Sequence, residues 1–313
     1  IFAVAADDKA VYAGTSPDGK IYRIEKGKAT EYFAPPQARY IWALRFGPDG
    51  ALYAATGEPG RVYRITAPGK GDIYYDSGQT HVTCLAFDST GKLLAGSEPN
   101  GILYRVESAN KAFVLFDANL PEIRSILTTP EGAIYAAALG GSLTRRGGAP
   151  GAISGIPSGA MVVAPAQSIT VTDAQSGLTP RPSVTSGIVS SSPIGAAGAQ
   201  SFEIAGVEKS AVYRINPDNT VDTMFSSKDE NSYDIAIRDG KIVFSTDGQG
   251  RVYTLGDDRK ASLIAQTNEA ETTRLVASTE GLLGISGSAG KLFRIGDTLT
   301  PKGEYESPVH DAG

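Results

Sequence analysis

The chain has few of the residues on which most catalytic and metal sites depend. Its 313 residues include one cysteine and two histidines. Cys84 therefore has no partner for an internal disulfide, and this set cannot supply the three or four ligands of a zinc site. Because Cys84 lies in a strand-like run, we expect a small buried side chain there. No G-x-S-x-G elbow and no P-loop occurs, so no motif identifies a catalytic residue.

Basic charge and long apolar runs are also lacking. Lysine and arginine number 29 against 34 aspartates and glutamates, which gives a net charge of −5 and a pI of about 5.2. Nucleic acid as a partner is therefore not expected, because it requires a basic surface. No apolar run approaches ~18 residues, so membrane insertion is not expected either. Hydrophobic residues make up 41% of the chain, which is enough for a buried core.

What the chain does contain is a repeat. An apolar residue, an aromatic residue, a polar residue and an apolar residue recur in six short segments, most of them about 41 residues from the next. A period of 40 to 50 residues with several strand signals is typical of a β-propeller blade. The segments are Ile21–Ile24, Val62–Ile65, Leu103–Val106, Val212–Ile215, Val252–Leu255 and Leu292–Ile295.

The second repeat shows the expected content of one blade. Strand-like runs cover residues 40–46, 51–56, 61–65 and 72–75, and the turn Gly47-Pro48-Asp49-Gly50 separates the first two. Four antiparallel strands in about 41 residues correspond to one blade. The sequence therefore predicts an all-β fold, a β-propeller of four-stranded antiparallel blades.

The number of blades and the domain limits follow from counting the repeats. Six sets predict six blades over residues 1–306, and a possible additional strand at 142–145 leaves seven as the alternative. Residues 140–206 are rich in Gly, Ala, Ser, Thr and Pro, which predicts a long low-complexity insertion within or after the fourth blade, either a linker or a lid. Residues 304–306 are expected to end the last blade, and 307–313 form a tail leading to a possible further domain.

The turns also carry a family resemblance. Ser16-Pro17-Asp18-Gly19, Gly47-Pro48-Asp49-Gly50 and Thr129-Pro130-Glu131-Gly132 resemble those of bacterial WD40-like and NHL (streptogramin-lyase-like) propeller repeats. The resemblance covers nearly the whole chain outside the insertion and implies a fold, because those families include scaffolds, ligand binders, lactonases and lyases. Quinoprotein propellers usually carry a tryptophan in each blade, so the single Trp42 argues against a quinone, and no cofactor is expected.

The innermost strands of a propeller line its central channel, so equivalent residues on these strands are candidates for a ligand site. Two arginines could hold a carboxylate or phosphate and the aromatic residues could stack on a sugar, or the ring could be a solvated channel in which Asp234 pairs with a neighbouring arginine. The aligned residues are Phe2, Trp42, Thr83, Arg124, Asp234 and Arg274.

Loop carboxylates form a weaker set of candidates. Asp18, Glu58, Glu98 and Asp247 lie between second and third strands, where they could bind Ca²⁺ or Mg²⁺ or could be ordinary turn residues. No catalytic residue is assigned, although His81 precedes an innermost strand near the expected channel mouth.

These patterns favour a non-catalytic binding or interaction platform that uses its channel face. A protein or a small molecule is the expected partner, and the expected location is periplasmic or extracellular. A small-ligand binder for an anion or sugar and a metal-dependent lactonase or lyase remain the alternatives.

Overall fold

The computed structural model describes residues 1–140, 208–256, 258–278, 281–287 and 290–296, all of which belong to one compact unit. In this part of the chain 21 strands form, and no helix there is long and apolar enough to cross a membrane. The expected insertion beyond residue 140, the extra strand at 142–145, the last strand at 304–306 and the tail 307–313 lie outside the described residues.

The strands pair antiparallel into five sheets, numbered here in chain order. Sheet 1 contains β1 (Ala3–Ala6), β2 (Val11–Gly14), β3 (Ile21–Glu25) and β4 (Lys28–Phe33). Sheet 2 contains β5 (Tyr40–Phe46), β6 (Leu52–Ala67), β7 (Lys70–Phe87), β8 (Leu93–Glu98), β9 (Ile102–Ser108) and β10 (Lys111–Asp117). Sheet 3 contains β11 (Glu122–Thr128), β12 (Ile134–Leu139), β13 (Ser210–Ile215) and β14 (Val221–Ser227). Sheet 4 contains β15 (Ser232–Arg238), β16 (Lys241–Thr246), β17 (Arg251–Leu255) and β18 (Ala261–Gln266). Sheet 5 contains β19 (Thr272–Ser278), β20 (Gly281–Ser286) and β21 (Leu292–Ile295).

The predicted propeller of four-stranded antiparallel blades is present, but the predicted number of blades is wrong. The described residues form five blades, not six or seven. The reason lies in the second and third repeats, which share sheet 2. The expected turn at 57–60 lies inside the 16-residue strand β6, and the expected break after Tyr75 lies inside the 18-residue strand β7. Pairing of Gly57 with His81 and of Gly60 with Gln79 continues one ladder through both repeats.

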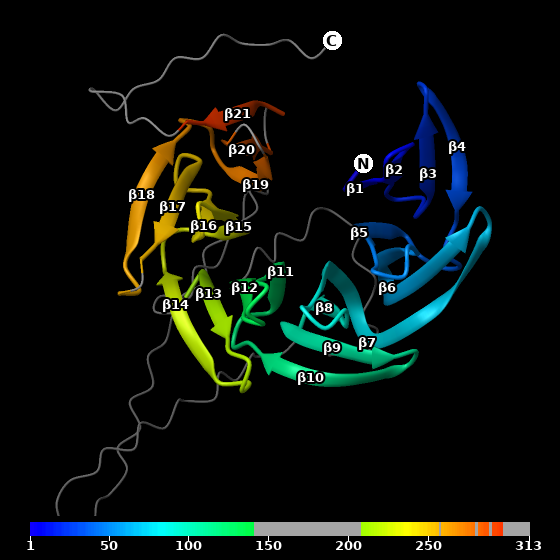
Figure 1. The fold of residues 1–313 in the computed structure, drawn as a ribbon, viewed down its shortest axis with the longest axis horizontal. Helices are drawn as coiled ribbons and strands as arrows, with labels where there is room; N and C mark the ends of the chain where they lie inside the picture. The colour runs from blue at the N-terminus through cyan, green and yellow to red at the C-terminus, as the bar shows by residue number, and fades with distance from the viewer. Residues whose placement is uncertain (141–207, 257, 279–280, 288–289, 297–313) are drawn as a thin grey trace, which may run out of the picture. The chain divides into compact units, whose positions relative to one another are not determined.

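The sheets follow one another around a common axis, and the first strand of each repeat lies innermost (Figure 1). Strand β1 packs beside β5, β11 beside β7 and β15, and β15 beside β19. The innermost positions are therefore occupied by β1, β5, the C-terminal half of β7, β11, β15 and β19. This order places the starts of these strands on one end of the channel, which is called the channel mouth below.

The hydrophobic core lies between neighbouring sheets. One cluster joins Ala3 and Ile21 of sheet 1 to Ile41 of sheet 2, and others join each later pair of sheets. Small residues permit the close approach. A Cβ on Gly14 would lie 2.7 Å from Cβ of Ile41 in the next sheet. Cys84 is buried with 6% exposure, as predicted.

In the first two repeats, a tyrosine of the second strand and the repeated arginine of the third strand form a polar cluster with an aspartate of the turn between the first two strands. In the second repeat, Asp49 Oδ2 accepts hydrogen bonds from Tyr53 Oη at 3.2 Å and from Arg64 Nε at 2.7 Å. In the first repeat, Tyr12 Oη donates to Asp7 Oδ2 at 3.2 Å and accepts from Arg23 Nε at 3.3 Å. The repeated arginine therefore has a structural role in these two repeats, at the end of the blade remote from the channel mouth.

Candidate functional site

A β-bulge recurs in the innermost strands and sets which residue can face the channel. In five of these strands the ladder to the second strand skips one residue. A bulged residue is unpaired in the ladder, and its side chain is re-aimed relative to those of its neighbours. The skipped residues are Trp42, Thr83, Arg124, Tyr233 and Thr273.

The sequence alignment of the channel ring was therefore wrong at two of its six positions. Asp234 and Arg274 are not bulged but pair in the ladder with Ser245 and Ile285, one residue beyond Tyr233 and Thr273. Phe2 is aligned correctly with Trp42, because Ala3 pairs with Gly14 as Ala43 pairs with Ala55. Ile41, Val82 and Ile123 precede the bulge in the other strands, whereas the polar Ser232 and Thr272 stand at this position in β15 and β19, so no apolar residue marks the register there.

The buried carboxylate of Asp234 connects three sheets. Asp234 is 6% exposed, and its Oδ1 accepts a hydrogen bond from Ser125 Oγ of sheet 3 at 2.5 Å. Its Oδ2 accepts from the Leu275 backbone N of sheet 5 at 2.9 Å, and Arg274 Nη1 lies 3.7 Å from Oδ1. Thr83 makes a comparable link, since its hydroxyl donates to the Ile123 carbonyl of sheet 3 at 2.5 Å. These two candidates join blades rather than face a ligand.

Aromatic rings gather at the channel mouth between sheets 1 and 2. The Trp42 ring contacts Phe2 edge-on with centroids 5.3 Å apart, and it stacks on Tyr40 at 5.0 Å with 6° between the planes. Trp42 Nε1 donates a hydrogen bond to His81 Nδ1 at 3.0 Å. Gly57 makes this possible, because a Cβ there would collide with both hydrogen-bonded nitrogens. Phe2 remains 50% exposed, so the cluster presents an aromatic surface to solvent.

The hydrogen bond from Trp42 determines which nitrogen of the neutral His81 ring carries the proton. Nδ1 accepts, so the neutral ring carries its proton on Nε2 and presents an N–H donor there. Burial lowers the pKa of His81, while the carboxylates of Glu58 and Glu122 act in the opposite direction. A protonated ring would have no acceptor for Trp42, which also favours the neutral form.

This arrangement predicts a pH effect on the fluorescence of Trp42, the single tryptophan of the chain. The folded-state pKa of His81 lies below its unfolded value of about 6.5, so the folded protein binds fewer protons. The contribution of neutral His81 to the free energy of unfolding is present above about pH 6.5 and is lost as the pH falls through the folded-state pKa. A fluorescence transition is expected below about pH 6.5.

The variant His81→Gln provides the control for this titration. Glutamine can accept the Trp42 hydrogen bond but cannot titrate, so the transition should disappear. Glu98 and Glu122 have raised pKa values and also titrate at acidic pH. A transition that persists in His81→Gln would assign it to these carboxylates and contradict the prediction.

Charged side chains continue the mouth from sheet 2 to sheet 3. Arg124 Nη1 lies 3.2 Å from Glu122 Oε1, and its side chain is 37% exposed. Burial raises the pKa of Glu122 against the opposing charge of Arg124. Burial also raises the pKa of Glu98, which faces His81 across the ladder between β7 and β8. His81 therefore lies between the aromatic rings and the charged side chains of the mouth.

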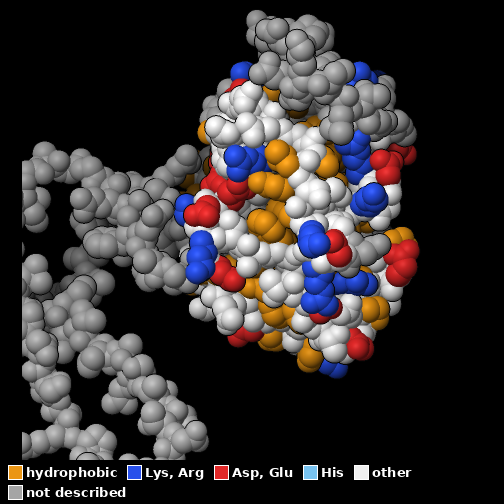
Figure 2. Space-filling view, turned by 90° about the vertical axis from the view of Figure 1, so that its left-hand side faces the viewer, with side chains coloured by type: hydrophobic (Ala, Val, Ile, Leu, Met, Phe, Trp, Pro, Cys, Tyr) orange, Lys and Arg blue, Asp and Glu red, His pale blue; other side chains and the backbone are white. Residues whose placement is uncertain are grey.

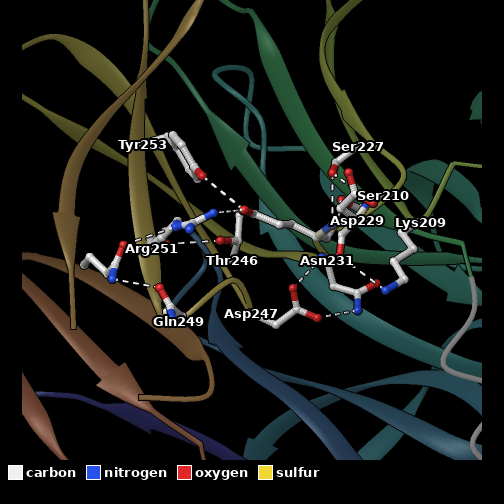
Figure 3. A network of polar contacts seen from close by, with 12 residues as sticks. Lys209, Ser210, Ser227, Asp229, Asn231, Thr246, Asp247, Gln249, Arg251 and Tyr253 are labelled. Carbon is white, nitrogen blue, oxygen red and sulfur yellow. Dashed lines mark hydrogen bonds and ion pairs between the residues drawn. The ribbon is translucent and has the colours of Figure 1, made fainter. Parts of the chain in front are cut away.

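A polar network fixes the mouth end of sheet 4 (Figure 3). Asp247 accepts hydrogen bonds from the backbone N of Asn231 at 2.8 Å and from its Nδ2 at 2.7 Å. Glu230 Oε1 accepts from Arg251 Nη1 at 2.5 Å and from Tyr253 Oη at 3.2 Å. The Asp247 carboxylate thus anchors the start of β15.

Two more of the loop carboxylates considered as metal ligands, Asp18 and Glu58, also bind side chains of the protein. Asp18 accepts a hydrogen bond from Thr15, and Glu58 pairs with Arg39 at 2.8 Å. Within the described ranges no three His, Cys, Asp or Glu side chains come together in a group that could hold a metal ion.

Sequence reasoning placed Trp42, Thr83 and Arg124 on innermost strands, and Phe2 lies directly before β1. Of the residues two positions before each bulge, it named only His81. Each of these residues lies at or directly before the start of an innermost strand, or of the inner half of β7, and therefore at the channel mouth. The sequence signal that relates these residues is their constant spacing from the bulged residue, which the structure identifies. They are Tyr40, His81, Glu122, Asn231 and Glu271.

The fold resembles those of solved propellers. A virginiamycin B lyase from Staphylococcus aureus, catalytically inactive and solved with quinupristin, is 14% identical and superimposes with a TM-score of 0.62 over 92% of this chain and 78% of that one. A structure of a nidogen/laminin complex is 12% identical, with a TM-score of 0.52 over 88% and 84%. The extracellular domain of a putative one-component system from B. thetaiotaomicron is 11% identical, with a TM-score of 0.54 over 91% of this chain and 31% of that one.

The fold is therefore that of a streptogramin-lyase-like β-propeller, as the turn sequences predicted. No protein-family model and no curated protein matches the chain. At these identities the comparisons show the fold, and propellers of this kind include both enzymes and binding proteins.

Proposed function

We propose that this chain is a non-catalytic binding module that acts outside the cytoplasm and holds a ligand at its channel mouth. The observation that carries the proposal is the ring cluster of Phe2, Trp42, Tyr40 and His81, from which Phe2 projects with 50% exposure. An aromatic surface beside a small number of polar groups is the usual composition of a ligand site. The extracellular neighbour among the solved propellers supports the location.

The blade architecture supports the same function. The hydrogen bonds of Asp234 and Thr83 join neighbouring sheets. They hold in place the innermost strands that carry the mouth residues. A site on rigid elements loses little conformational entropy when a ligand binds. The Nε2–H of His81 provides a donor within the ring cluster, and Arg124, with its 37% exposed side chain, provides further donors at the mouth.

The test uses Trp42 emission to screen a metabolite library that contains cationic, neutral and anionic compounds. A hit should bind Phe2→Ala at least about tenfold more weakly, the factor expected for a lost aromatic contact. Phe113→Ala is the matched control, because Phe113 is 54% exposed on β10 at the outer edge of sheet 2. Equal losses in both variants, or a library without any hit, would contradict a channel-mouth site.

A second candidate is a protein partner on the outer strands. Leu263 on β18 is 51% exposed and Val221 on β14 is 38% exposed. Figure 2 shows hydrophobic side chains gathered between charged ones on the side of the molecule that carries these strands. Exposed apolar patches with polar surroundings are typical of interaction surfaces.

A further inference from the structure

We propose that the ligand of the channel mouth carries an organic cation, such as an alkylammonium group, and that Glu98 is the carboxylate that receives it. The inference rests on the proposed function and specifies the charge of the ligand.

The Glu98 carboxylate lacks a direct partner. Glu98 ends β8, opposite His81 on β7, so the two side chains lie on the same face of the sheet. Among the described residues its carboxylate has no hydrogen bond and no ion pair within 4.0 Å, although the residue is half-buried. Burial raises its pKa, and the more distant charge of Arg124 opposes this shift only in part. A half-buried carboxylate of this kind gains most from a cation or a hydrogen-bond donor.

The cations around the mouth are already paired. Arg39 lies 2.8 Å from Glu58, and Arg124 lies 3.2 Å from Glu122. Each of these guanidinium groups makes its direct ion pair with another carboxylate, and the charge of Arg124 reaches Glu98 only at longer range. An anionic ligand would add a second uncompensated charge, whereas a cationic ligand would neutralise the first.

The rings that contact His81, the cross-strand neighbour of Glu98, suit the same ligand. The Arg39 guanidinium lies 5.7 Å from the centroid of the Tyr40 ring, so one ring of the cluster already interacts with a cation. The half-exposed Phe2 and the partly exposed Trp42 provide further aromatic surface. Rings together with a carboxylate are the arrangement that proteins use to hold ammonium groups.

The experiment compares choline with 3,3-dimethyl-1-butanol, which has the same shape without the charge, and with acetate and Ca²⁺. Binding is followed by Trp42 emission and by calorimetry. Choline should bind at least about tenfold more tightly than the alcohol, because it alone can form a charge-assisted contact. Glu98→Gln should remove this preference, whereas Glu131→Gln, at an exposed turn remote from the mouth, should retain it.

Several results would overturn the inference. The alcohol or acetate could bind as tightly as choline, Glu98→Gln could leave choline binding unchanged, or Ca²⁺ could displace choline through Glu98. Absence of choline binding would overturn it as well. The proposed function would survive each of these results if a neutral or anionic compound in the library screen still depended on Phe2.

Discussion

Replacing Asp234 with alanine is expected to lower the free energy of unfolding by about 2–4 kcal/mol. The substitution leaves the Ser125 hydroxyl and the Leu275 amide, both buried, without their acceptor. Each unsatisfied buried donor costs about 1–3 kcal/mol. Urea denaturation followed by Trp42 emission and by circular dichroism measures the loss.

Two variants show whether the loss comes from the link between sheets. Asp234→Asn keeps one acceptor and should lose about half as much stability. Asp239→Ala removes an aspartate whose side chain is 83% exposed, and its effect should lie within about 0.5 kcal/mol. An Asp234→Ala protein as stable as the Asp239→Ala protein would show that the carboxylate does not hold sheets 3, 4 and 5 together.

The second large effect is expected from Gly101→Ala, which should lower the free energy of unfolding by about 3 kcal/mol. Gly101 lies between β8 and β9 with φ of 58°, and a Cβ there would collide with the Leu120 carbonyl oxygen. The Gly101 carbonyl also accepts a hydrogen bond from Ala118 N at 3.1 Å. The loop must therefore move away from the segment that leads into sheet 3.

Gly50→Ala separates the two causes of this loss. Gly50 has φ of 74°, and no atom lies within 4 Å of its potential Cβ. It should cost about 1 kcal/mol, the penalty of a left-handed conformation alone. The collision at Gly101 accounts for the remainder. Equal losses in both variants would mean that the approach of Gly101 to Leu120 has no energetic role.

Local patterns were sufficient for the strands and for the type of fold. The segment Val62–Ile65 and its equivalents became strands in every repeat, and the four-residue turn Gly47-Pro48-Asp49-Gly50 separates β5 from β6 as predicted. Such features depend on residues near one another in the chain, so alternation and turn chemistry predict them. The merging of two repeats into sheet 2 depends on backbone pairing of Gly57 with His81, which no side-chain pattern reports.

The candidate site was predicted less well because a bulge shifts every later residue of a strand by one position. Trp42 and Arg124 were aligned correctly, since the apolar residues Ile41 and Ile123 precede them. In β15 and β19 the bulge follows a serine and a threonine, which gave no apolar signal for the register. Asp234 was therefore assigned to the channel, although it is buried between sheets.

The amino-acid order by itself determined a ring of antiparallel blades, because its period and alternation are local properties of the chain. Tertiary structure alone decided which carboxylates are compensated. Glu58, Glu98 and Asp247 occupy equivalent positions after the second strand of their repeats or at its end. Arg39 pairs with Glu58 and Asn231 binds Asp247, whereas Glu98 is left without a direct partner among the described residues. Electrostatic compensation depends on distances between residues far apart in the sequence, and only the packing of the sheets sets those distances.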